Sequence, residues 1–327
     1  MKKLLLFSFI TCLVAALQAC SGPQTKPLAK DNLTDSGIYD ADISTDGTLA
    51  LISTVDAGIH VWSLVEHANL FTWQHQGDGG NLVDNVHISA DQTYAVTADS
   101  EAFALWDLTT GDPIGFWRID ESTIRDIAVS NGGSGVLVGR ANGNVLFFEP
   151  TTGRSLEFLG HQEKVNTVDI SPNGKFALTG GNDYKAYLWS TESGQVIHVF
   201  NHANRVTMVS IDDQARYLFT ADSQDDATIW DAQTGNAVSR LKFIERQIVF
   251  TSARFSQDGK HLLTGSPAKR LALWDVKTGS SVTEWRVAPS NGPAPQSAVV
   301  YGVGFKDQEI ISISSSGNVE YWNQQSN

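Results

Sequence analysis

The chain has 327 residues, of which 41% are hydrophobic, 9% aromatic and 18% charged, with 28 glycines and only 9 prolines. This composition excludes collagen, low-complexity disorder and a coiled coil, and two cysteines exclude a disulfide scaffold and a multi-cysteine zinc or iron–sulfur site. The formal charge of −13, from 23 basic and 36 acidic side chains, repels nucleic acid and anionic lipid surfaces, so no nucleic-acid partner is expected.

The first residues have the pattern of an export signal. Met1-Lys2-Lys3 is basic, and the apolar run over 4–17 is too short for a lasting transmembrane helix. The run ends in Leu17-Gln18-Ala19-Cys20, which resembles the lipobox of bacterial lipoproteins. In that family cleavage before the cysteine is followed by acylation of its sulfur and its new amino group. An ordinary signal peptide with a chance cysteine is the alternative.

The resemblance implies three segments: a signal peptide over 1–19, a lipidated tether over 20–26 that begins at Cys20, and a folded domain over 27–327. Several acyl chains would hold the protein stably on the membrane, where one chain would not. Ser21 after the cysteine resembles the outer-membrane sorting signal of Gram-negative bacteria. The expected location is therefore the periplasmic side of the bacterial envelope, at the outer membrane.

One aromatic position recurs seven times through the rest of the chain. It is occupied by Trp62, Trp106, Phe148, Trp189, Trp230, Trp274 and Trp322, at spacings of 44, 42, 41, 41, 44 and 48 residues. A second block recurs in phase with it, at residues 38–44, 83–89, 124–130, 165–171, 206–212, 250–256 and 300–306. In-phase matches to both blocks exceed chance and predict seven structural repeats.

The fourth repeat shows the chemistry of each unit. Its apolar runs, at 165–171, 175–180, 186–189 and 194–200, are separated by polar turns rich in Gly, Asn and Asp. This pattern is typical of four short strands joined as hairpins. In the first run Val165 and Val168 lie three apart, which breaks the period of two and predicts a β-bulge.

Together these features resemble the WD40 family over roughly residues 27–323. The Trp-Asp dipeptide of that family is present at Trp106, Trp230 and Trp274. The resemblance implies an all-β fold, a seven-bladed WD40-type β-propeller. After Trp322 too few residues remain for a last outer strand, so by register the missing strand is expected at 27–33, and the N-terminus would close the ring.

The resemblance also implies a structural tetrad inside a blade, in which an indole, a hydroxyl, an imidazole and a carboxylate satisfy one another. The fourth repeat has all four members, which are His161, Thr179, Asp183 and Trp189. The fifth repeat has three, which are His202, Thr220 and Trp230, with Gln224 in place of the carboxylate. The other repeats keep fewer members.

Catalytic and metal-binding patterns are weak. His198 and His202 share an HxxxH spacing, but along a strand they are about 13 Å apart and cannot bind one ion. Ser266 and Lys269 match an SxxK motif, but in a strand-to-strand turn rather than at a helix start. The acidic turn that contains Asp222, Asp225 and Asp226 departs from the spacing of a calcium loop. We therefore expect no catalytic residue, no metal and no cofactor.

The remaining candidate is a binding surface. In WD40 proteins the usual docking face carries the loops that lead into the inner strands. The residues at that face of this chain are expected to be Tyr39, Asp84, Arg125, Lys164, Asn166, Arg205, Thr207, Thr251 and Tyr301. Tyrosines and basic groups on an acidic body suit the anchors of a protein interface.

Three functions remain open. The favoured one is a non-enzymatic, lipid-anchored platform that binds protein partners on the periplasmic side. The second is an enzyme or cofactor-binding propeller, such as a hydrolase or a quinoprotein. The third is a subunit of an outer-membrane assembly complex, which rests on an analogy of fold and location alone. The long connection at 286–298, rich in proline, is a further candidate segment for function.

Overall fold

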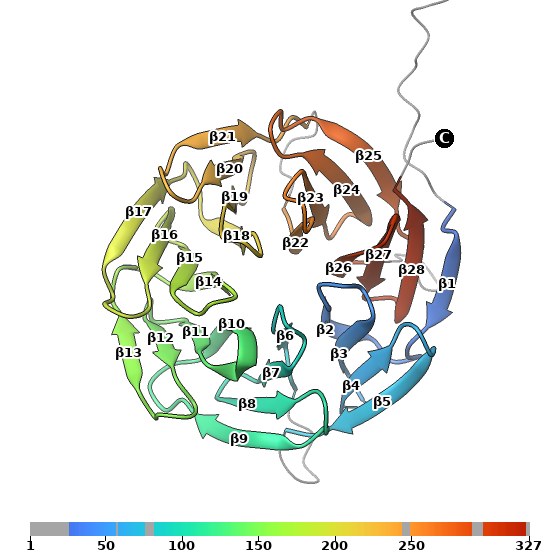
Figure 1. Ribbon diagram of the computed structural model, residues 1–327, viewed down its shortest axis with the longest axis horizontal. Helices are drawn as coiled ribbons and strands as arrows, with labels where there is room; N and C mark the ends of the chain where they lie inside the picture. The colour runs from blue at the N-terminus through green and yellow to red at the C-terminus, as the bar shows by residue number, and fades with distance from the viewer. Residues whose placement is uncertain (1–25, 57, 76–81, 244–248, 290–296, 325–327) are drawn as a thin grey trace, which may run out of the picture.

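The computed structural model describes residues 26–56, 58–75, 82–243, 249–289 and 297–324. In this part of the chain the strands form seven four-stranded antiparallel sheets, arranged as blades around a central axis (Figure 1). The predicted all-β class and seven-bladed ring are confirmed. Among the described residues no helix has the length and apolar character that crossing a membrane requires.

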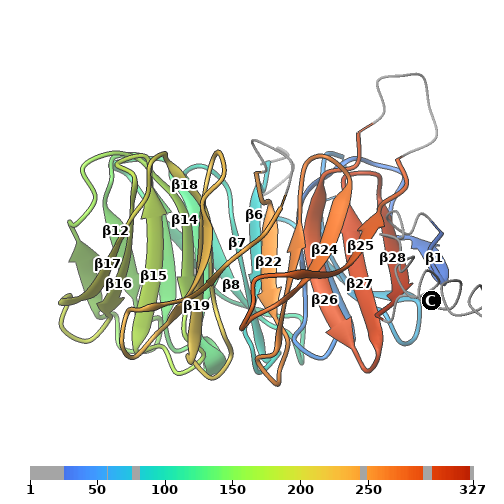
Figure 2. The same ribbon diagram turned by 90° about the horizontal axis from the view of Figure 1, so that it is seen from above.

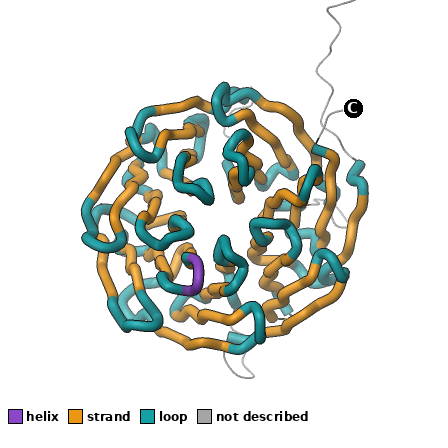
Figure 3. The backbone as a smooth tube through the Cα atoms, in the orientation of Figure 1, coloured by secondary structure: helices purple, strands orange, loops and turns teal. Residues whose placement is uncertain are grey.

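Each blade runs from an inner strand beside the axis to an outer strand at the rim (Figure 1). Blade one contains β2 (Ile38–Ile43), β3 (Leu49–Thr54), β4 (Gly58–Ser63) and β5 (Ala68–Trp73). Blade two contains β6 (Asn85–Ile88), β7 (Tyr94–Ala98), β8 (Ala102–Asp107) and β9 (Pro113–Arg118). Blade three contains β10 (Ile124–Val129), β11 (Val136–Arg140), β12 (Val145–Phe148) and β13 (Ser155–Phe158). Figure 3 shows the short helical turn η1 (Asn131–Gly133) that follows β10.

The next three blades repeat this arrangement. Blade four contains β14 (Val165–Ile170), β15 (Phe176–Gly181), β16 (Lys185–Ser190) and β17 (Val196–Asn201). Blade five contains β18 (Val206–Ile211), β19 (Tyr217–Asp222), β20 (Ala227–Asp231) and β21 (Ala237–Arg240). Blade six contains β22 (Ser252–Phe255), β23 (His261–Gly265), β24 (Arg270–Asp275) and β25 (Ser281–Arg286). The seventh blade contains β26 (Val300–Lys306), β27 (Glu309–Ser314), β28 (Asn318–Asn323) and, from the other end of the chain, β1 (Ala29–Asn32).

The N-terminal strand closes the ring. β1 pairs with β28 so that Ala29 lies opposite Tyr321 and Asn32 opposite Asn318. The backbone N–H groups of Leu28 and Leu33 extend the pairing on both sides. The predicted closing strand over 27–33 is confirmed, although its regular part is limited to four residues.

Two faces of the ring are defined by the loops that each carries, and Figure 2 shows them edge-on. The top face carries the loops that lead into the inner strands, such as 160–164 and 202–205, and the turns between second and third strands, such as 182–184. The bottom face carries the turns between first and second strands, such as 171–175. Because β1 is antiparallel to β28, it begins on the bottom face, where β28 ends.

Local sequence explains the repeated strand geometry. The pairing of β14 with β15 shifts register between Val165 and Thr167, which confirms the predicted bulge. The inner strands β2, β10, β18 and β26 shift at the same place. The recurring turn before each outer strand ends on glycine with φ between 66° and 80°, at Gly111, Gly153, Gly194, Gly235 and Gly279. Glycine adopts this left-handed conformation without the steric cost that a Cβ brings.

The apolar core is divided among the blade interfaces. Seven clusters of buried side chains occur in the described residues, and each is shared by two neighbouring blades. Trp189 of blade four, for example, is fully buried and stacks on Phe158 of blade three with ring centroids 4.5 Å apart. Trp73, Trp117 and Trp285 lie on outer strands.

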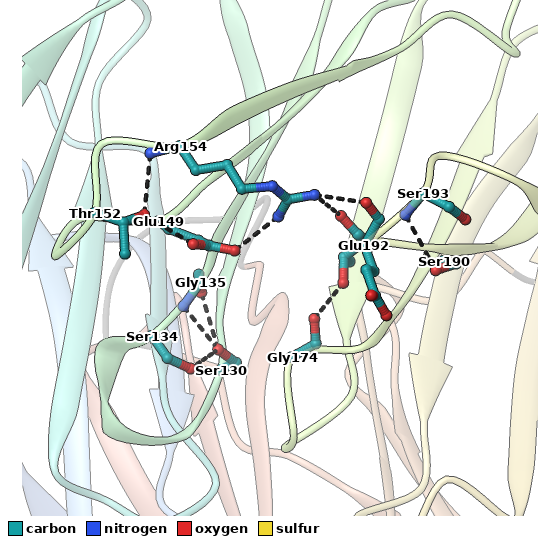
Figure 4. A network of polar contacts seen from close by, with 11 residues as sticks. Ser130, Ser134, Gly135, Glu149, Thr152, Arg154, Gly174, Ser190, Glu192 and Ser193 are labelled. Atoms are coloured by element: carbon teal, nitrogen blue, oxygen red, sulfur yellow. Dashed lines mark hydrogen bonds and ion pairs between the residues drawn. The ribbon is translucent and has the colours of Figure 1, made fainter.

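Polar contacts add further links on the bottom face. Arg154 of blade three donates from Nη1 to Glu149 Oε1 over 2.7 Å, within its own turn. Its Nη2 donates to the carbonyl oxygens of Thr191 and Glu192 in blade four, at 3.0 and 2.7 Å (Figure 4). Arg216 of blade five reaches the carbonyl of Asp258 in blade six in the same manner. Neighbouring blades are therefore joined by both apolar and polar contacts.

Candidate functional site on the top face and in the central channel

The residues predicted for partner binding lie at or just before the start of inner strands, on the top face. Asp84, Arg125 and Arg205 are exposed, whereas the other six side chains are half-buried. Partner binding by these nine residues remains a prediction, but the structure separates those whose polar groups are already engaged from those that are open to solvent.

Two of the nine form hydrogen bonds with a neighbouring blade. Asn166 donates from Nδ2 to Asn182 Oδ1 and to the carbonyl of Val206 in blade five, both over 2.8 Å. Thr251 donates to the carbonyl of Val300 in blade seven over 2.6 Å. Asn166 and Thr251 therefore hold blades together and offer little to a partner. The hydroxyl oxygen of Thr207 is buried and has no hydrogen-bond partner among the described residues.

The basic residues form a cluster. Arg125, Lys164 and Arg205 start the inner strands of blades three, four and five, and we call them the basic triad. Burial lowers the pKa of the Lys164 ammonium, and the positive charges of Arg125 and Arg205 lower it further. The triad is therefore a local concentration of positive charge on a protein whose net charge is −13.

Acidic and aromatic groups face the triad from the other blades. Burial raises the pKa of Asp84, and the charge of Arg125 opposes that rise. Tyr301 is half-buried and packs with the cluster shared by blades seven and one, and its pKa is raised by burial and by the nearby Asp40. Asp84 therefore lies within electrostatic reach of Arg125, and Tyr301 within reach of the channel acid Asp40.

The tetrad of the fourth repeat is only partly closed. His161 lies 3.0 Å from Asp183 Oδ1 through Nδ1 and 2.9 Å from Thr179 Oγ1 through Nε2. Burial alone would raise the pKa of Asp183, but the hydrogen bond and the charge of His161 bring it below its ordinary value. The indole N–H of Trp189 has no hydrogen-bond partner among the described residues, so the expected fourth contact is not made. Flat stacking on Phe158, with ring planes 2° apart, holds that indole instead.

The fifth repeat has a tetrad carboxylate, contrary to the expectation that Gln224 replaces it. Trp230 Nε1 donates to Thr220 Oγ1 over 2.8 Å, and His202 Nε2 lies 2.9 Å from the same hydroxyl. Asp226, rather than position 224, lies 3.3 Å from His202 Nδ1. Burial raises the pKa of Asp226, but hydrogen bonds with His202, Thr228 and Arg240 outweigh that effect and bring it well below its usual range.

The second repeat also holds more of the tetrad than its sequence indicates. Trp106 Nε1 donates to Thr97 Oγ1 over 2.8 Å, and His75 Nδ1 lies 3.1 Å from Asp99 Oδ2. Tryptophan–hydroxyl bonds of the same kind link Trp274 to Thr264 and Trp322 to Ser312. The expectation that the other repeats keep fewer members is therefore wrong for the second repeat, whereas among the described residues the sixth and seventh show only the tryptophan–hydroxyl bond.

Metal-type ligands meet at one place on the top face, but they serve the fold. Atoms of His202, Asp222 and Asp226 lie within 4.8 Å of one another. Asp222 Oδ1 accepts the backbone N–H groups of residues 224, 225 and 226. Asp226 Oδ1 lies 2.8 Å from Arg240 Nη2. Both carboxylates are thus already engaged, Asp222 by backbone donors and Asp226 by a guanidinium, and both serve the fold.

The central channel holds a group of charged residues that sequence reasoning missed. It forms a cavity of about 180 Å³ whose lining includes Asp40, Asp42, Asp126, Asp169 and Arg254. They occupy the third or fifth position of the recurring inner-strand block, and so does His87. Alternate residues of a strand point to the same side, so this period of two was the available signal.

Each of these acids links its own blade to the next. Asp40 Oδ2 accepts the N–H of Val86, and Asp42 Oδ2 accepts that of Ile88, both over 2.8 Å. The same bond recurs from Val168 to Asp126 and from Ile211 to Asp169, both over 2.7 Å. The carboxylates thus satisfy backbone donors that the channel would otherwise leave unpaired.

Arg254 of blade six provides the positive charge among these acids. Its Nε donates to the carbonyl of Val303 in blade seven over 3.0 Å, and its Nη2 lies 2.6 Å from Asp42 Oδ1 in blade one. The guanidinium therefore spans the whole inner strand of blade seven. That strand has Gly302 and Gly304 where other blades carry side chains, and a Cβ at Gly304 would lie 2.6 Å from Ile43.

Burial dominates the electrostatics of the channel. It raises the pKa of Asp126 to about 6 and that of Asp169 to about 7, and it raises the pKa of Asp40 well above its ordinary value. Burial also lowers the pKa of His87, which therefore stays neutral near pH 7. The channel holds protons near neutral pH, which links its charge to the surrounding pH.

Replacing the tetrad threonine by valine should cost more in blade five than in blade four. Thr220→Val strands two groups, Trp230 Nε1 and His202 Nε2, whereas Thr179→Val strands only His161 Nε2. An unpaired buried polar group costs about 1–3 kcal/mol, so the free energy of unfolding should fall by about that much more in Thr220→Val. Chemical denaturation of the two variants measures the difference, and equal losses would contradict it.

Stability should decrease as the pH rises through the range in which the channel acids ionise. A carboxyl group whose pKa is higher in the folded state stabilises the fold fully below its unfolded pKa of about 4, and this contribution is lost as the pH passes its folded pKa. For Asp126 and Asp169 those values are about 6 and about 7. Together the two groups should lower the free energy of unfolding by about 4 kcal/mol between pH 5 and pH 8.

The variant Asp169→Asn should make that fall smaller, because one of the titrating groups is gone. Exchange of the exposed Glu192 for Gln should leave the pH profile unchanged and serves as the control. Unfolding curves in guanidinium chloride at several pH values provide the test. A profile that is flat, or that rises toward pH 8 in the parent protein, would show that the channel acids do not carry the pH dependence.

One comparison with known proteins supports the repeat assignment. The family model described as WD domain, G-beta repeat, matches residues 153–190, which contain strands β13 to β16. A search of curated proteins finds no match to the chain. The matched segment includes Thr179, Asp183 and Trp189, and it lies within a ring of seven blades built on the same plan. The chain is therefore a seven-bladed β-propeller that carries a WD40 repeat.

Proposed function

We propose that this protein is a non-enzymatic platform that is lipid-anchored in the bacterial envelope, faces the periplasm and binds a protein partner on its top face. Propellers built from WD40 repeats are commonly protein-interaction scaffolds. The observation that carries the proposal for this chain is the position of β1, which begins on the face opposite the predicted docking residues.

The anchor follows from the sequence that precedes β1. Cys20 lies outside the described residues, and six residues separate it from Pro27. At roughly 3.5 Å per residue those six residues span at most about 20 Å. An acylated Cys20 would therefore hold the bottom face near the lipid, and the top face would point away from the membrane.

The top face suits a partner better than the bottom face does. Asp84, Arg125 and Arg205 are exposed on this face, and the half-buried Tyr301 lines the channel. Aromatic and arginine side chains contribute most to protein interfaces when a partner covers them. The bottom face instead uses its long polar side chains, such as Arg154 and Arg216, to join blades.

Removal of the anchoring thiol should release the protein from the membrane. Cys20→Ala prevents acylation, so the chain should remain uncleaved or become soluble. The matched control is Cys12→Ala, because Cys12 lies in the apolar run of the signal and would leave with it. Membrane fractionation with intact-mass measurement distinguishes the variants. Unchanged membrane attachment of Cys20→Ala, with cleavage at another site, would contradict the proposed anchor.

Crosslinking in intact cells tests the platform. A photoreactive amino acid at Asp84 or Tyr301, on the top face, should capture a defined envelope protein that mass spectrometry identifies. The same amino acid at Asn173 or Asp258, in exposed turns of the bottom face, should not capture it. Capture from the bottom positions alone would mean that the partner binds the opposite face.

A further inference from the structure

We propose that the basic triad and the groove beside it form a docking site for a short acidic segment of a partner protein. This inference rests on the function proposed above and names the chemistry of the partner. It depends on three observations: the triad has no ion-pair partner, its charges are close together, and a polar groove adjoins it.

The triad is unpaired, although acidic side chains outnumber basic ones in this chain. Seven other arginines form ion pairs with Asp or Glu, and they are Arg118, Arg140, Arg154, Arg216, Arg240, Arg254 and Arg270. Among the described residues no acidic side chain lies within ion-pair distance of Arg125, Lys164 or Arg205. The three cations therefore lack a direct ion pair, which most of the other arginines have, although the charge of Arg125 also acts on Asp84 and Asp126.

The three charges act on one another. Lys164 is half-buried between two exposed arginines, and its ammonium loses stability from burial and from both neighbouring charges. An arriving carboxylate would relieve this repulsion, and the gain is available only to a negatively charged ligand. Arginine also offers paired donors that match the two oxygens of a carboxylate.

A groove begins at Arg205 of the triad and crosses the tops of blades four and five. Arg205 lines it together with Asn182, Asn204, Tyr184 and one carboxylate, that of Glu163. The Tyr184 side chain is 53% exposed, which is unusual for a large aromatic residue and leaves its ring free for contact. Amide side chains supply donors and acceptors for a peptide backbone, so the groove fits an extended segment whose acidic side chains reach the triad.

The charge of the whole protein favours a short acidic segment over a long polyanion. With a net charge of −13 the body repels nucleic acid and an anionic bilayer. At physiological salt, charges more than about 8 Å apart are largely screened, so a few carboxylates placed on the triad feel mainly the local positive charge. A segment of a folded partner can present such a short cluster and keep the rest of its chain away.

Fluorescence anisotropy with the full-length, detergent-solubilised protein tests the proposal. The probe is a fluorescein-labelled decapeptide of alternating Glu and Gly, and the comparison peptide has Gln in place of each Glu. The parent protein should bind the Glu peptide and not the Gln peptide, with affinity that falls as salt is raised. The triple variant Arg125→Gln, Lys164→Gln, Arg205→Gln should bind about tenfold more weakly.

A matched control separates the site from net charge. Lys175→Gln, Lys260→Gln, Lys277→Gln removes three exposed cations from the bottom face and changes the charge of the protein equally. It should bind the Glu peptide as the parent protein does. Equal weakening in both triple variants would overturn the proposal, and so would the absence of Glu-peptide binding to the parent protein. Binding of phosphatidylglycerol vesicles through the triad, without peptide binding, would assign the site to lipid instead.

The inference and the proposed function fail in different ways. If crosslinking at Asp84 and Tyr301 still captures the same protein from the top-face triple variant, the platform stands and the acidic segment is wrong. If the Glu peptide binds as expected but no protein is captured from the top face in cells, the site exists and the proposed platform is wrong. Thermal melting of both triple variants confirms that they fold.

Discussion

A blade of this protein cannot bury its own apolar surface. Each four-stranded sheet has two faces, and each buried cluster in the described residues draws its side chains from two neighbouring blades. A row of such sheets would leave one apolar face exposed at either end. The stable solution is a closed ring, and the ring in turn creates a central channel, a top face and a bottom face.

The consequences of closure explain where polar groups are placed. Inner strands approach the axis without a sheet partner on the channel side, so their side chains take over the task of linking blades. Asp126 and Asp169 do this by accepting backbone N–H groups of the following blade. On the bottom face Arg154 does it with carbonyl oxygens. On the top face fewer side chains form such inter-blade hydrogen bonds, so this surface is the one available for binding.

The fold could be predicted from the sequence because the residue pattern of one blade recurs seven times. Seven in-phase blocks determine the number of blades, and the repeat register predicts an outer strand near residue 30, where β1 pairs with β28. The tetrads were harder to predict because they depend on loop length. The turn after β19 covers residues 223–226, one residue longer than the turn at 182–184, and the carboxylate comes from its last residue, Asp226, rather than from its second residue as in blade four. His75 was not predicted as a tetrad member because it lies 22 residues before Thr97, whereas His161 lies 18 residues before Thr179.

The candidate site was predictable only in part. The position of Arg125, Lys164 and Arg205 on one face follows from the repeat register, but their mutual proximity depends on how blades three to five are rotated about the axis. Side-chain orientation also could not be read from the sequence, since Asn166 and Thr251 start inner strands as Arg125 does and yet point to a neighbouring blade. The channel acids could be predicted only with the knowledge that the bulge directs the third and fifth residues of each inner-strand block toward the channel.

Closure by β1 also sets the order in which the chain can be completed. This strand is synthesised first, and its partner β28 comes at the other end, so blade seven forms only when nearly the whole chain is available. The contact between Arg254 and Asp42, which are 212 residues apart, has the same requirement. Contacts between distant parts of a chain form slowly, and an unpaired strand edge is open to association during that time. β1 has only four residues, and two of them, Lys30 and Asp31, are charged. A short length and charged side chains both disfavour pairing of an exposed strand edge with another chain.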